Sequence, residues 1–162
     1  MSDQRWKEIL VILETKVALL DRGFIQSMTR EILDAYEWMA PTMEGYCKIT
    51  CPSCTDPCCD ARQIFYNQTD MLCLAALGIS PPPGQTRIHP SDPCRYLTPT
   101  GCRLPRIARP YVCVWYLCEA QVDLFREESA STQRRFLREL EHIRVSRLKL
   151  ESLYETHFPT LL

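Results

Sequence analysis

The chain has 162 residues, a length that suits one globular domain with its own apolar core. Its formal net charge of −1 excludes the strongly basic field expected of a general nucleic-acid or membrane-surface binder. The unusual features are ten cysteines and twelve prolines against only five glycines. We expect a single domain over 1–162, made of N-terminal helices (1–40), a cysteine-rich core (41–118) and C-terminal helices (119–162).

The compartment determines what the cysteines can do. The apolar run from Ile9 to Leu13 is interrupted by Glu14, and it is too short for the core of a signal peptide. No stretch approaches the length needed to span a bilayer, so we expect a cytoplasmic protein with no membrane partner. In a reducing compartment, clustered cysteines indicate metal ligands or redox groups in preference to a disulfide framework.

Two amphipathic helical segments are predicted before residue 40, forming either a hairpin or one bent helix. Apolar residues recur at spacings of three and four from about residue 3 to residue 20, with Asp3 as the expected cap. Gly23 offers a break after this helix. The pattern resumes from Phe24 to Met39, and Pro41 is expected to end it. The aromatic residues of both helices are expected to pack in the core.

From Ala40 to Asp60 the periodic pattern disappears, and prolines punctuate the segment. Such a long irregular loop needs a source of order other than apolar packing. Bound metal is such a source, because its binding free energy becomes folding free energy.

A short helix follows from Thr69, its expected N-cap, to Leu77, and Gly78 is placed to end it. Cys73 within this helix is expected to be a buried packing residue. Further on, the sequence 98–101 has the pattern of a tight turn that would return Cys94 toward Cys102 in a hairpin. The segment 111–117 fits either a short strand or a helical turn.

The last third of the chain, from Val122 to Leu150, has helical periodicity in one long helix or two, with a cap allowed between Ser129 and Ser131. Its many arginines alternate with glutamates. This favours a solvated helix face over a nucleic-acid surface. The predicted fold class is therefore mainly α, with N- and C-terminal helices packed around an irregular cysteine-rich metal-binding core that includes a short hairpin.

The cysteine spacing carries the functional prediction. Cys51 and Cys54 have the CxxC spacing that zinc sites and iron–sulfur sites share. The adjacent Cys58 and Cys59 would point to opposite sides of an extended segment, which disfavours binding of all four thiolates to one ion. The predicted metal ligands come from both cysteine stretches: Cys51, Cys54, Cys58, Cys59, Cys94, Cys102, Cys113 and Cys118.

Arginines and aromatic residues accompany the second cysteine stretch. The arginines are expected to offset the negative charge of a thiolate site; they are Arg95, Arg103, Arg106 and Arg109. The aromatic residues could either pack in an ordinary core or shield a cluster from water; they are Tyr96, Tyr111, Trp115 and Tyr116. Among the histidines only His89 is placed to be considered as a ligand, and a surface position is favoured for it.

The ordered motifs resemble the CxxCxxCC family, which is described as a zinc- or iron-chelating domain (YkgJ-like). The resemblance covers about residues 47–118 and rests on Cys51-x2-Cys54-x3-Cys58-Cys59, Cys94-Arg-Tyr-Leu97, Gly101-Cys102 and Arg109-Pro110-x2-Cys113. The family usually has two residues before the cysteine pair, whereas this chain has three. The resemblance implies metal binding through the eight cysteines named above.

We therefore expect a protein that coordinates an iron–sulfur cluster, or zinc, in a redox, sensing or electron-transfer role with a redox or protein partner. A structural zinc module that binds a protein partner is the alternative. A lysine N-methylase-like enzyme is a third reading, implied only by distant relatives of the family, and whether the chain is an enzyme stays open. Substitution of Cys47 or Cys73 is expected to leave metal binding intact.

Overall fold

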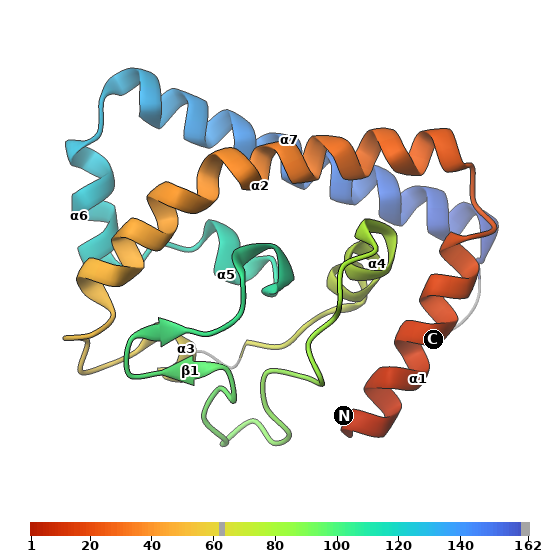
Figure 1. Ribbon diagram of the computed structural model, residues 1–162, viewed down its shortest axis with the longest axis horizontal. Helices are drawn as coiled ribbons and strands as arrows, with labels where there is room; N and C mark the ends of the chain where they lie inside the picture. Colours follow the sequence, from red (N-terminus) through yellow and green to blue (C-terminus); the bar gives the residue numbers. More distant parts are fainter. Residues whose placement is uncertain (62–63, 160–162) are drawn as a thin grey trace.

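The fold is mainly helical and is seen in a computed structural model that describes residues 1–61 and 64–159 (Figure 1). The elements in chain order are α1 (Asp3–Val17), α2 (Arg22–Thr50), α3 (Cys58–Ala61), α4 (Gln68–Leu77), β1 (Leu97–Thr98), β2 (Gly101–Cys102), a 3-10 turn η1 (Arg106–Ala108), α5 (Val112–Trp115), α6 (Glu119–Glu127) and α7 (Ala130–His157). The predicted fold class, including the short hairpin, is confirmed.

Two long helices form the frame of the molecule. Figure 1 shows α2 and α7 side by side along most of their length, with α6 crossing near the end of α2. An apolar cluster fills this junction, because buried residues of α2 recur at helical spacing and meet those of α7. Its buried members are Ile32, Ala35, Tyr36, Met39, Met43, Tyr46, Val114, Phe136 and Ile143.

A second apolar cluster lies where α1 and α4 pack together against the C-terminal half of α7. Trp6 is fully buried there, packs against the ring of Tyr66, and donates its indole N–H to the carbonyl oxygen of Pro82 at 2.7 Å. The proline-rich linker is thereby fixed to α1. Cys94 and Cys102 lie at the margin of this cluster, so the cysteine-rich region is bordered by both apolar clusters.

The predicted end of the second helix at Pro41 is wrong, because α2 continues without interruption to Thr50. Proline within a helix removes one backbone hydrogen bond and disfavours the helical conformation of the preceding residue. Here buried residues on both sides of Pro41, Met39 and Met43, pack into the α2–α7 cluster and offset that cost. The irregular segment expected from Ala40 therefore begins only after residue 50.

Several predicted helix boundaries also shift. Ser2, not Asp3, caps α1 by accepting a hydrogen bond from the Arg5 amide. Gly23 lies inside α2, which Asp21 caps, so the break between the helices precedes the glycine. Asn67 takes the N-cap position expected for Thr69 and forms a capping box with Asp70. In α1 and α4 the side chain that caps the free amides comes one or two residues before the predicted cap.

Other predictions about the helices are confirmed. Gly78 ends α4 with a φ of 63°, the left-handed conformation that favours glycine. Ser129 caps α7 and separates it from α6, so the C-terminal third contains two helices. Helical conformation also prevails at 112–115, where strand and helix were both open. Within the described ranges, every helix is too short or too polar to cross a membrane.

Candidate metal centre

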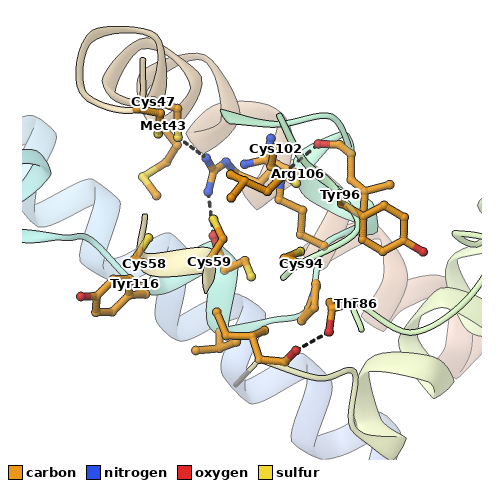
Figure 2. A pocket seen from close by; sticks show the side chains of 18 of the residues that line it. Met43, Cys47, Cys58, Cys59, Thr86, Cys94, Tyr96, Cys102, Arg106 and Tyr116 are labelled. Atoms are coloured by element: carbon orange, nitrogen blue, oxygen red, sulfur yellow. Dashed lines mark hydrogen bonds between the residues drawn. The ribbon is translucent and has the colours of Figure 1, made fainter. Parts of the chain in front are cut away.

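A cavity of about 70 Å³ lies between the end of α2 and the loops that follow it, and we call it the central cavity. Figure 2 shows several of its cysteines around one hollow, although they come from segments far apart in the sequence. The cysteines that line it are Cys47, Cys51, Cys58, Cys59, Cys94, Cys102 and Cys113. Six of the eight predicted ligands are thus brought together, with Cys47 in addition.

The last turn of α2 supplies the first wall. Cys47 and Cys51 are four residues apart, so they lie on one face of the helix. Cys51 is the C-cap, and its amide donates to the Cys47 carbonyl at 2.9 Å. Had the helix been predicted to continue past Pro41, the spacing of four would have placed Cys47 beside Cys51.

The adjacent pair Cys58 and Cys59 begins the short helix α3, not an extended segment. Helical backbone separates neighbouring side chains by about 100° instead of placing them on opposite sides. Both thiols reach the central cavity, and a hydrogen bond between them is the main cause that raises the pKa of Cys59. The predicted opposite orientation is therefore wrong.

The hairpin brings Cys102 back to the cavity near Cys94. Leu97 pairs with Cys102 and Thr98 with Gly101, as the turn pattern predicts. Gly101 has a φ of 112°, a conformation that other residues rarely adopt, and a Cβ at this position would lie 3.5 Å from the Cβ of Cys51. The positive φ, and not a lack of space, favours glycine at this turn beside the end of α2.

Cys113 is held by contacts at the N-terminal end of α5 and at its own carbonyl. The Tyr111 amide donates to the buried carboxylate of Asp70 at 3.0 Å, and Arg147 of α7 donates to the same oxygen at 2.6 Å. The carbonyl of Cys113 accepts a hydrogen bond from Arg106 at 3.0 Å. A buried ion pair in the frame thus fixes the segment that carries this thiol.

Burial dominates the acid–base properties of the cavity thiols. It raises the pKa of Cys51 to about 11 and that of Cys113 to about 12. Neighbouring thiols add to the effect, Cys47 for the first and Cys102 for the second. Burial likewise raises the pKa of Cys102. These three thiols are protonated at neutral pH unless a cation takes the place of the proton.

Two of the four arginines expected near the cysteines do line the cavity. Arg106 and Arg109 are buried, and both donate to one carboxylate oxygen of Glu44, at 3.1 and 2.9 Å. The other two do not line the cavity: Arg95 pairs with Asp3 at 2.7 Å, and Arg103 stacks over the ring of Tyr96, which is itself a lining residue.

The remaining predicted ligands, Cys54 and Cys118, line a neighbouring groove of about 730 Å³, which we call the outer groove. Cys54 is exposed, and Cys118 is the N-cap of α6. Cys51, Cys58 and Cys59 line the groove as well as the cavity. The two hollows therefore share a wall of thiols.

The aromatic residues divide in the same way. Tyr96 and Tyr116 line the central cavity, whereas Tyr111 and Trp115 line a different pocket. His89 is exposed, which confirms its expected surface position. Cys73 is buried in the α1–α4 cluster, which confirms its expected packing role.

The thiols gather, but they do not yet converge. Among the residues that the structure describes, no three cysteine, histidine, aspartate or glutamate side chains are arranged closely enough to hold a metal ion as they stand. Binding would require the sulfur atoms to lose protons and move toward a common centre.

Comparisons with known proteins add no relative: no family model, no curated protein and no solved structure matches the chain. The resemblance to the CxxCxxCC family remains a prediction from the motifs.

Proposed function

We propose that the protein binds a metal centre through the thiols of the central cavity, an iron–sulfur cluster in preference to zinc. The observation that carries the proposal is that seven cysteines, from segments between residues 47 and 113, line one cavity. In a reducing compartment such a set is suited to thiophilic metals.

The donor set fits the group. Four thiolates complete a structural zinc site or hold a [4Fe–4S] cluster, and the cavity offers more than four. Its volume of about 70 Å³ exceeds what a single water molecule needs. The inner candidates from the predicted set are Cys51, Cys58, Cys59, Cys94, Cys102 and Cys113, with Cys54 and Cys118 at the adjoining groove.

The charge of the wall also fits. Arg106 and Arg109 contribute two positive charges, and Glu44 offsets one of them. Four thiolates around zinc or a cluster leave a net negative charge, which the remaining guanidinium charge would stabilise. The arginines are held in place by backbone carbonyls as well, since Arg109 donates to Leu104 at 2.9 Å.

The preference for iron and sulfide rests on the surplus of thiols and on two N–H donors, from Arg106 and Gln121, that lie 3.5 Å from Cys47 Sγ. When bound, a cluster supplies one-electron redox chemistry, with a potential set by such hydrogen bonds and by burial. A redox, sensing or electron-transfer role with a protein partner follows from that assignment. Zinc in the same cavity would instead serve structure and favour an interaction module.

The test is anaerobic purification followed by a visible spectrum and measurement of iron, sulfide and zinc per chain. We expect a coloured protein with iron and sulfide in equal amounts, and a colourless protein that carries zinc would support the alternative. Cys113→Ser should lose metal, whereas Cys73→Ser, buried outside the cavity, should retain it. Absence of any stoichiometric metal from the native protein would refute the proposal.

A further inference from the structure

Cys47 precedes the cysteine motif and was expected to be dispensable for metal binding, yet it lines the central cavity. It lies one helical turn before Cys51, and Met43, one turn earlier, lines the cavity as well. This stripe is the face of α2 that is turned toward the other thiols. Figure 2 shows Cys47 and Met43 together on this side of the cavity.

The sulfur of Cys47 has two N–H donors. Arg106 Nη2 and Gln121 Nε2 each lie 3.5 Å from Cys47 Sγ. Gln121 also donates to the hydroxyl of Thr50 at 3.2 Å, which fixes the amide on this wall. Both donor residues are buried, so their N–H groups have been removed from water and need acceptors. An anionic sulfur is a stronger acceptor than a neutral thiol.

Charge balance points to the same sulfur. The side chains of Arg106 and Arg109 are only 2% and 6% exposed, and they share the single carboxylate of Glu44. Arginine keeps its proton, so the wall carries one buried positive charge more than Glu44 can offset. A buried charge is costly without a counter-charge. The sulfur of Cys47 accepts a hydrogen bond directly from Arg106.

We propose that Cys47 is a metal ligand of the central cavity, bound as a thiolate that Arg106 and Gln121 stabilise. This rests on the proposed function and adds to it a ligand that the motif does not contain. Cys47 and Cys51 would then contribute two thiolates from consecutive turns of one rigid helix, to iron or zinc. The remaining thiols of the central cavity would complete the set.

The experiment has two arms. In the first, the protein purified without oxygen is alkylated with iodoacetamide before and after removal of its metal by a chelator, and each cysteine is mapped by mass spectrometry. In the second, the zinc affinities of reduced, metal-free wild type, Cys47→Ser and Cys73→Ser are compared by competition with a chromogenic chelator. Loss of a residue that only supports a ligand costs about 10–100-fold in affinity, so loss of a ligand should exceed about 100-fold.

We expect alkylation of Cys47 only after metal removal, together with a loss of more than 100-fold for Cys47→Ser and little change for Cys73→Ser. Alkylation of Cys47 in the metal-loaded protein, with Cys113 protected, would overturn the ligand assignment and leave the proposed function standing. If no cysteine is protected and wild type binds no zinc, both fail. Should Cys47→Ser not fold, the alkylation of wild type decides alone.

Discussion

The molecule has two regions whose order has different origins. The helical frame, α1, α2, α4, α6 and α7, contains most of the buried apolar side chains. The cysteine region, residues 51–59 and 84–118, has only a two-stranded hairpin and single helical turns. Apolar burial accounts for the frame, whereas the cysteine region buries thiols and arginines that packing alone stabilises poorly.

This difference shows how one chain can separate stability from chemistry. The frame keeps α2 helical past Pro41, and it places Cys47 and Cys51 on a fixed face. The cysteine region then brings the remaining thiols to that face along shorter, less regular segments. If the proposal is correct, metal binding supplies the order that the second region lacks.

Removal of the metal should have the largest effect, and it should be confined to one region. Structural metal binding contributes about 10 kcal/mol or more to folding in small thiolate sites. We expect chelation to accelerate amide exchange strongly at residues 84–118 while the paired faces of α2 and α7 stay protected. Hydrogen exchange with mass spectrometry measures this, and equal acceleration in both regions would show that their stabilities are not separate.

The sequence predicts the frame well because apolar periodicity is a local signal that packing reinforces. The two C-terminal helices and the glycine cap at Gly78 follow from this signal and from short-range cap chemistry. Pro41 misleads because the local preference against helix is overcome by contacts of Met39 and Met43 with residues far along the chain. No local pattern contains that information.

The candidate site is predictable only in part. Cysteine spacing indicates six thiols that the structure gathers in the central cavity. Cys47 was not predicted as a site residue, because it lies beside Cys51 only if the helix continues past Pro41, where it was expected to end. The pairing of Arg95 with Asp3, which takes one expected arginine away from the site, depends on a long-range approach that spacing does not encode.

A core substitution in the frame should reverse the pattern seen on metal removal. Ile143 is fully buried in the α2–α7 cluster, and Ile143→Ala should cost about 3 kcal/mol through lost burial and a cavity. Metal content per chain should be unchanged, because this residue does not line the central cavity.

Urea unfolding measures the cost, and Leu137→Ala is the matched control. Leu137 is 59% exposed on the same helix, so its loss should change stability by less than about 0.5 kcal/mol. Loss of metal from Ile143→Ala at temperatures where the protein stays folded would show that the frame and the site are coupled more tightly than we infer.

The smallest effect concerns Cys73, a cysteine that belongs to the frame. Burial raises the pKa of Cys73 from 9.0 to about 11, with Arg147 acting in the opposite direction. Because the folded state holds this proton more tightly than the unfolded chain, the stabilisation is fully present below about pH 9 and is lost as the pH rises through 11. A shift of this size corresponds to roughly 2–3 kcal/mol. Urea unfolding of the reduced, metal-free protein should show that stability falls between these pH values. Cys73→Ala should lessen this fall, whereas the control Cys54→Ala, at an exposed thiol, should not. Equal slopes for wild type and Cys73→Ala would mean that the thiol of Cys73 does not titrate with the folding of the frame.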